Sequence, residues 1–156
     1  MLQVVMCGPF TSRSGYGDHA RSIFYSLDTI EDFDIRIIDV RWGDTPQNAL
    51  NPNVDKEKTL LDKIVTGNEL KAQPDIYVDV RIPNEFMAIG KVNVGITAGI
   101  ETTAVSSAFL QGANQMQLLI VPSEHSKKTF IETSYDAVDQ QGNPIPNNQL
   151  KCTVPI

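Results

Sequence analysis

The glycines that follow the first apolar run are the residues best suited to chemistry. The stretch CGPFTSRSGYGDHAR, residues 7–21, places Gly15 and Gly17 on either side of Tyr16, where a helix is expected to begin. Glycine lets the backbone approach a ligand closely, and the free amides of a helix N-terminus attract an anion such as a diphosphate. The spacing from Gly8 to Gly15 does not match the dinucleotide-binding fingerprint, and a P-loop would need Gly-Lys-Ser or Gly-Lys-Thr. The stretch therefore predicts either an anion-binding loop or a tight turn without a ligand.

A second polar stretch, TAGIETT at residues 97–103, offers one carboxylate and three hydroxyls after a later apolar run. Ligands of open α/β sheets bind at the carboxyl ends of the strands, which makes Glu101 and Thr102 candidate contacts. The same residues also fit a helix start, with Thr102 or Thr103 as its cap and Glu101 as a solvated acid. Both interpretations stay open at this point.

Several isolated side chains are weaker candidates. His19 and His125 each follow a predicted loop, but two separate imidazoles make neither a metal site nor a catalytic triad, so surface or capping roles are expected. Trp42, the only tryptophan, could stack on a sugar ring or pack beneath the next loop. Four charged residues near predicted strands could meet a ligand or simply be solvated: Asp39, Arg41, Arg81 and Glu85.

Short apolar runs alternate with segments of helical period, which indicates βα units and predicts an α/β fold, a parallel sheet with helices on both faces. The predicted strands are residues 2–7, 34–42, 75–81, 91–97 and 117–121. Three helices are predicted to bury one face each, formed by Ala20, Ile23, Phe24 and Leu27, by Leu60, Leu61, Ile64 and Val65, and by Val105, Ala108, Phe109, Gly112 and Met116.

The fifth strand is followed by a strong helix start. Ser123 can cap the free amides and Glu124 favours the positive helix end. The tail at 134–156 clusters Gly, Pro and Asn between residues 142 and 148, which predicts a turn or hairpin instead of a helix. Because successive carboxyl ends of parallel strands meet at one edge, the loops at 8–17, 98–103 and 122–125 are expected together there.

Length and composition limit the classes of function. A chain of 156 residues is one domain, and its formal charge of −6 would be repelled by nucleic acid and by anionic lipid. Two cysteines do not make a disulfide framework or a zinc site, and we expect no bound metal. The first residues lack the features of a signal peptide and no segment approaches the length of a membrane span, so a cytoplasmic protein is expected.

Three segments in this order resemble the N-terminal domain of GT-B glycosyltransferases. They are CGPFTSRSGYGDHARSI at 7–23, NVGITAGIETT at 93–103 and FLQGANQMQLLIVPSEHSKKTF at 109–130, of which the last is the most specific. The resemblance is closest to the retaining group called glycosyltransferase family 4 and its relatives in large phages and viruses. It implies a Rossmann-like domain over 1–156, with 134–156 leading toward a donor-binding domain that is absent from this chain.

In that family the N-terminal domain holds the acceptor, the C-terminal domain holds the nucleotide-sugar, and transfer takes place in the cleft between them. The resemblance implies that Gly15, Tyr16 and Gly17 lie near the donor diphosphate and that Glu101, where many relatives carry His or Asp, lies near the acceptor as the catalytic candidate. Arg13 would stabilise the charge that grows on the leaving diphosphate. No metal or cofactor is implied, and the remaining expected substrate contacts are His19, Thr102, Ser123 and Glu124.

Other functions remain open at this stage. The chain could be a non-catalytic binding or interaction module that keeps an anion-binding βα loop, and even as half of a transferase it is expected to be inactive alone. A flavodoxin-like or receiver-like domain shares the alternation of strands and helices. A receiver, however, needs an acidic cluster after its first strand, and Cys7, Gly8 and Pro9 stand there.

Overall fold

The structure, a computed structural model, describes residues 1–66 and 70–156. The elements of the α/β part are β1 (Leu2–Gly8), α1 (Gly15–Leu27), β2 (Phe33–Asp39), α2 (Asp55–Leu61), β3 (Ile76–Val80), a short 3-10 helix η2 (Pro83–Glu85), β4 (Val92–Ile96), α3 (Ser107–Ala113), β5 (Leu118–Ile120) and α4 (Glu124–Glu132). A hairpin of β6 (Ser134–Val138) and β7 (Pro144–Lys151) completes the chain. The predicted strands are confirmed, each within a few residues of its observed bounds.

The five strands β1 to β5 form a parallel sheet in the order β2-β1-β3-β4-β5. An isolated parallel bridge joins Ile64 to Ile37 on the outer side of β2, where Ile37 N donates to Lys63 O at 2.9 Å and Val65 N donates to Ile37 O at 2.9 Å. Counted as a rudimentary strand, this bridge gives the doubly wound order of a Rossmann-like sheet. The prediction that Ile64 and Val65 continue the second helix is therefore wrong, because α2 ends at Leu61 and the chain turns into this pairing.

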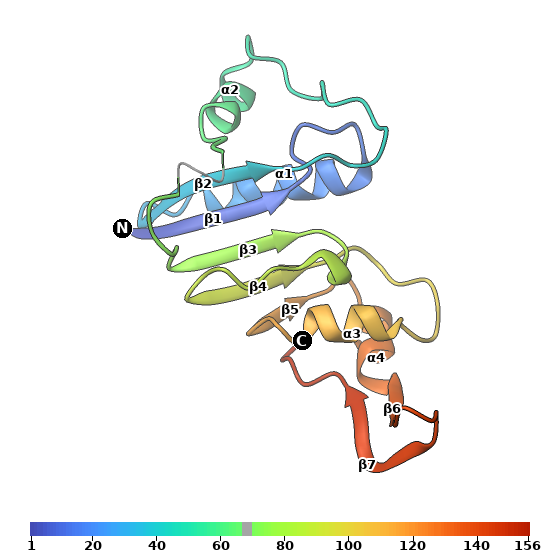
Figure 1. Ribbon diagram of the computed structural model, residues 1–156. Helices are drawn as coiled ribbons and strands as arrows, with labels where there is room; N and C mark the ends of the chain where they lie inside the picture. The colour runs from blue at the N-terminus through green and yellow to red at the C-terminus, as the bar shows by residue number, and fades with distance from the viewer. Residues whose placement is uncertain (67–69) are drawn as a thin grey trace.

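Helices cover both faces of the sheet, as predicted, but the helices on the two faces lie over different halves of the sheet. On one face α1 buries Ala20 and Phe24 against Met6 of β1 and Val78 of β3. On the opposite face α3 and α4 pack around Leu119 of β5, and Figure 1 shows α1 and α3 on opposite sides. The sheet is thus covered by helices on both faces, each face over a different part of the sheet.

Serine hydroxyls begin three of the helices. Ser14 Oγ accepts from Gly17 N at 3.0 Å in α1, and Ser123 Oγ accepts from Ser126 N at 3.1 Å in α4, which confirms the cap predicted at Ser123. In α3 the cap is Ser106, whose Oγ accepts from Phe109 N at 3.2 Å. The interpretation in which Thr102 or Thr103 caps this helix is therefore wrong, and Thr102 Oγ1 donates instead to Ala104 O at 2.7 Å.

The buried face of α3 also differs from its prediction in part. Gly112 and Met116 are buried as expected, but Ala108 is exposed and Leu110 takes its place in the core. The cause is close packing, since a Cβ on Gly112 would lie 1.7 Å from Pro83 O of η2. The helix turns its one glycine against η2, and this rotation decides which other residues face inward.

The last segment forms the predicted hairpin, which extends from the α/β part next to α3 and α4 (Figure 1). Its base is fixed by Tyr135 Oη, which donates to Val105 O at 2.6 Å, and by Asn114 Nδ2, which donates to Lys151 O at 2.7 Å. The chain then returns to the sheet, where Leu119 N of β5 donates to Pro155 O at 2.9 Å.

Candidate functional site

The loop between β1 and α1 is held by its own hydroxyls. Ser12 donates to Pro9 O through its backbone N at 3.1 Å and through its Oγ at 2.9 Å, and Ser12 Oγ lies 2.6 Å from Ser14 Oγ. Thr11 donates to the Asp39 carboxylate through its N at 3.0 Å and its Oγ1 at 2.6 Å. Asp39 thereby ties the end of β2 to this loop.

The two glycines around Tyr16 have different structural roles. A Cβ on Gly17 would lie 2.5 Å from Ser12 O, so this glycine is required where α1 passes under the loop. A Cβ on Gly15 would meet no described atom within 4 Å, and Gly15 is exposed. Only Gly15 therefore leaves open space beside the first amides of α1, which have no intrahelical acceptor.

A hollow of about 410 Å³ lies beside the N-terminus of α1, lined by Arg13, Ser14, Gly15, Asp18, Arg21 and Ala49. Arg13 reaches across it and donates to Asn48 Oδ1 at 2.8 Å and to Asn48 O at 3.1 Å. Arg21 donates to Phe10 O at 2.6 Å and to Ser12 O at 3.0 Å, and it also pairs with Asp18. Both guanidinium groups are thus engaged with the chain at the wall of the hollow.

Tyr16 connects three loops at the carboxyl edge. Its Oη lies 3.0 Å from Thr97 Oγ1 and accepts from Ala98 N at 3.1 Å, at the end of β4. Its ring lies against Trp42, with ring centroids 4.4 Å apart and planes inclined by 32°. Because β3 lies between β1 and β4 in the sheet, Tyr16 reaches across the end of β3.

His19 lies one turn after Tyr16 on α1. Its Nε2 is buried and has no hydrogen-bond partner within the described parts of the chain. A buried polar nitrogen without a partner is unusual in folded proteins, where such groups nearly always find one. The expectation of a plain surface or capping role is not met, and His19 keeps a free polar atom beside the site.

The loop at 98–104 is fixed to α4. Ile100 N donates to Ser126 Oγ at 3.0 Å, and Thr102 O lies 3.2 Å from His125 Nε2. Glu101 is exposed and forms no ion pair or hydrogen bond with the described residues. The structure therefore presents the Glu101 carboxylate to solvent, at the same edge as Tyr16.

Ser123 and Glu124 lie at the N-terminus of α4. Ser123 Oγ is already used in the helix cap, and Glu124 is exposed. Both residues line a separate hollow of about 450 Å³ that also includes Lys127 and Ile156. Of the predicted site residues, Arg13 and Gly15 thus line the hollow at α1, and Ser123 and Glu124 line the hollow at α4. The others, Tyr16, Gly17, His19, Glu101 and Thr102, line neither of the two hollows. The three loops expected at one edge do meet there, which confirms that part of the prediction.

The carboxyl end of β3 holds a buried ion pair that sequence reasoning did not find. Arg81 donates through Nε and Nη2 to the two oxygens of Asp79, each at 2.7 Å, and Met87 N donates to Asp79 Oδ2 at 3.0 Å. Asp79 is 0% exposed and the Arg81 side chain 11%. Burial lowers the pKa of the Arg81 guanidinium, but the hydrogen bonds and charge of Asp79 outweigh it, so this pKa is raised.

Cys7 lies opposite Asp79 across the β1–β3 ladder. Burial raises the pKa of its thiol from 9.0 to about 11, and the negative charge of Asp79 adds to the effect. A thiol with a raised pKa carries little thiolate at neutral pH and is a poor nucleophile. Cys7 therefore belongs to the packing beneath the site and not to its chemistry.

Comparison of the chain with models of known families, with curated proteins and with solved structures finds no match.

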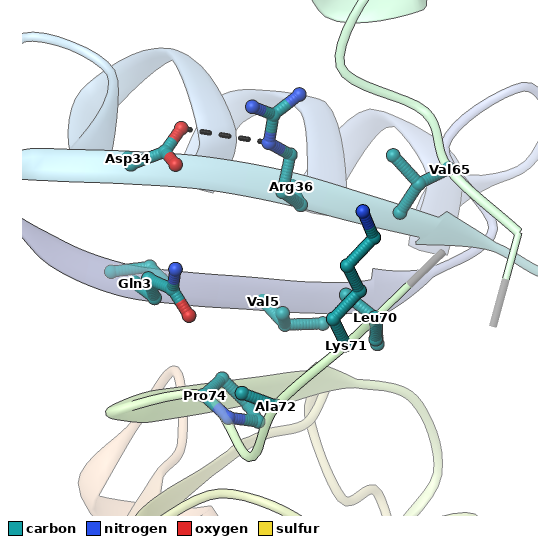
Figure 2. A pocket seen from close by; sticks show the side chains of 10 residues that line it. Gln3, Val5, Asp34, Arg36, Val65, Leu70, Lys71, Ala72 and Pro74 are labelled. Carbon is teal, nitrogen blue, oxygen red and sulfur yellow. Dashed lines mark ion pairs between the residues drawn. The ribbon is translucent and has the colours of Figure 1, made fainter. Parts of the chain in front are cut away.

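The hollow drawn in Figure 2 lies over the amino-terminal halves of β1 and β2, on the face of the sheet opposite α1. It measures about 370 Å³ and is lined by residues from the first halves of β1 and β2 and by the segment before β3, including Gln3, Val5, Asp34, Arg36, Leu70 and Lys71. None of the predicted site residues lines it. In doubly wound sheets ligands bind beyond the carboxyl ends of the strands, which favours the opposite edge as the functional one.

Two further findings limit the chemistry of the described residues. No group of three or more His, Cys, Asp or Glu side chains among residues 1–66 and 70–156 is placed to hold a metal ion. In the same residues, helices long and apolar enough to cross a membrane are absent.

Proposed function

We propose that this domain is the acceptor-side, N-terminal half of a GT-B glycosyltransferase that moves a sugar from a nucleotide-sugar to an acceptor. The observation that supports it best is the Tyr16 bond to the end of β4, 3.0 Å to Thr97 Oγ1. It brings together the first two segments of the family resemblance, which are distant in sequence. In such an enzyme these segments would form one wall of the cleft.

The proposed roles follow from which groups remain free. The exposed amides beside Gly15 would meet the donor diphosphate, because the hollow there is open and the helix end is positive. Arg13 lies at its rim and would need to leave Asn48 to reach an anion. Glu101 would face the acceptor hydroxyl as a base, since its carboxylate is exposed and unpaired among the described residues.

The isolated domain is expected to be inactive. Transfer requires that donor and acceptor be held together and shielded from water, and the groups that would bind the nucleotide-sugar belong to a second domain. What remains is weak anion affinity at α1, in the millimolar range or roughly 4 kcal/mol.

One observation favours a second function, a non-catalytic binding module. The loop between β1 and α1 satisfies its own hydroxyls, and Arg13 and Arg21 both bond to the chain. A loop so completely bonded can serve as a stable surface for a partner without any chemistry. This alternative also keeps the hollow at α1.

The test uses Trp42, because the chain has no other tryptophan and this one lies at the proposed cleft. Its fluorescence and calorimetry would follow titration of the chain with UDP, GDP, ADP and their sugar conjugates. Gly15→Val should weaken nucleotide binding at least fivefold, since a branched side chain would fill the open space. Ser26→Val, which places the same branched side chain on an exposed position of α1 about three turns from its N-terminus, is the matched control.

A transfer assay completes the test. The chain would be assayed alone and with a donor-binding domain encoded in the same or a neighbouring reading frame, over a panel of glycoside acceptors. Activity only in the combined sample supports the transferase. Robust turnover by this chain alone, or nucleotide binding that Gly15→Val leaves unchanged, would reject the proposed roles.

A further inference from the structure

The largest apolar side chain of the protein is left out of its core. Three clusters of buried apolar residues stabilise the described parts of the chain, and neither Trp42 nor Tyr16 belongs to any of them. Both residues are half-buried, and each is in contact with the other. The aromatic pair therefore lies outside the buried clusters, and tryptophan held partly in solvent is typical of binding surfaces.

The pair is also held rigidly. The Tyr16 hydroxyl is bonded to Ala98 N at 3.1 Å and to Thr97 Oγ1 at 3.0 Å, which fixes the plane of its ring. On the other side Thr45 N donates to Trp42 O at 3.1 Å, and Val40 N donates to Gly8 O at 3.0 Å just before Trp42. A rigid aromatic surface binds with a smaller loss of conformational freedom than a mobile one.

The chemistry of the surface selects its ligand. It offers flat apolar area without a cation of its own, so it suits the C–H face of a pyranose ring, whose hydroxyls can stay in water. A nucleobase would stack equally well but would leave its ring edge without partners, because the Tyr16 hydroxyl and Thr97 are already bonded to each other.

We propose that the exposed face of Trp42, backed by Tyr16, binds the pyranose ring of the acceptor. That the bound sugar is the acceptor of a transfer reaction rests on the proposed function. Binding of a pyranoside to Trp42 can be measured without that assumption.

The test measures pyranoside binding without using tryptophan as the reporter. Saturation-transfer NMR and calorimetry would be run with methyl β-D-glucopyranoside, methyl α-D-mannopyranoside and UMP on the full chain. We expect millimolar binding of at least one pyranoside. Trp42→Ala should weaken it at least tenfold and Trp42→Phe about threefold, in line with the loss of stacking area.

Two further variants keep the test decisive. Trp42→Leu retains apolar volume beside Tyr16 without an aromatic face, so it replaces Trp42→Ala if that variant does not fold. Tyr25→Phe, on the part of α1 that contacts Lys56, is the control and should bind pyranosides like the wild type. Unchanged pyranoside binding in Trp42→Leu, no binding of either pyranoside, or UMP binding that Trp42→Leu weakens more than pyranoside binding would overturn the proposal.

The two proposals fail in different ways. Pyranoside binding that depends on Trp42, with no transfer in the presence of any donor domain, keeps the aromatic site and rejects the transferase. Transfer activity with the same KM for the acceptor in Trp42→Leu and wild type keeps the transferase and rejects the aromatic site.

Discussion

Two Asp-x-Arg pairs lie at opposite ends of this sheet, and they behave differently. Asp34 and Arg36 on β2 border the hollow of Figure 2, where they are 3.5 Å apart and their side chains are 35% and 50% exposed. Asp79 and Arg81 at the end of β3 form two bonds of 2.7 Å with the aspartate fully buried. The same sequence pattern yields a solvated pair at one end and a fixed structural element beside the candidate site at the other.

The comparison shows that the two regions differ in internal order more than in the volume of their hollows, which is about 370 Å³ for the hollow of Figure 2 and about 410 and 450 Å³ for the two hollows at the candidate site. The hollow of Figure 2 is bordered by the exposed side chains of Gln3, Arg36 and Lys71, and its one ion pair joins two partly exposed groups 3.5 Å apart. At the carboxyl end Tyr16, Asp39 and Asp79 each hold a neighbouring loop by short hydrogen bonds. Preorganised groups bind with a smaller entropy loss, so the better ordered edge is the better candidate.

The largest expected effect comes from neutralising one member of each pair. Asp79→Asn should lower the free energy of unfolding by about 3–5 kcal/mol, because it leaves Arg81 buried beside a neutral amide. Asp34→Asn should cost less than about 0.5 kcal/mol, since exposed pairs are screened by water. Urea unfolding followed by circular dichroism would measure both; similar losses in the two variants would mean that the pairs do not differ.

A second prediction compares the two glycines of the carboxyl edge. Gly17→Ala should destabilise the fold by about 2–3 kcal/mol, because its Cβ would lie 2.5 Å from Ser12 O. Gly15→Ala should leave stability within about 0.5 kcal/mol or raise it slightly, since alanine favours the helix. The same unfolding curves provide the measurement, and a neutral Gly17→Ala would show that the loop is not held as tightly as its bonds indicate.

A third prediction concerns pH, through Cys7 beside Asp79. The pKa of the Cys7 thiol is about 11 in the folded protein, against an ordinary value of 9.0. The neutral thiol therefore contributes fully to the free energy of unfolding below pH 9, and this contribution is lost as the pH rises toward 11. The loss should reach about 2.5 kcal/mol. The measurement is the urea midpoint from pH 8 to 11 for wild type against Cys7→Ala. Parallel curves for the two proteins would contradict the assignment.

The smallest expected effect is that of one hydroxyl. Tyr16→Phe should cost about 1–2 kcal/mol, because Ala98 N loses its acceptor at the end of β4. Hydrogen exchange of the Ala98 amide should rise while that of Ile37, in β2, stays constant. Unchanged exchange at Ala98 would mean that Tyr16 does not hold this loop.

Sequence reasoning succeeded where one element determines the outcome. The period of α1 and the serine before α4 need no knowledge of the rest of the fold, and both predictions were confirmed. It failed where a distant partner decides. Ile64 lies outside the helix and pairs with Ile37, and Gly112 packs α3 against Pro83. The local spacing of apolar residues contains no information about either partner.

The candidate site was less predictable for the same reason. The pattern Asp-x-Arg occurs at 34–36, 39–41 and 79–81, and only the order of the strands decides that the last of these is buried. Tyr16 and Thr97 are 81 positions apart, so no local sequence spacing predicts their hydrogen bond. The sequence did single out one residue of this region, the lone Trp42 after β2. Both stacking on a sugar ring and packing beneath the next loop were compatible with its position.

The two lateral edges of the sheet have a further consequence for the behaviour of the protein in solution. Beyond β2 the chain supplies the bridge at Ile64, and beyond β5 it supplies the carbonyl of Pro155. Exposed edge strands are templates on which other chains add and aggregate. Two hydrogen bonds at the β2 flank and one at the β5 flank are thus already made within the chain, which leaves fewer free backbone groups for an added strand.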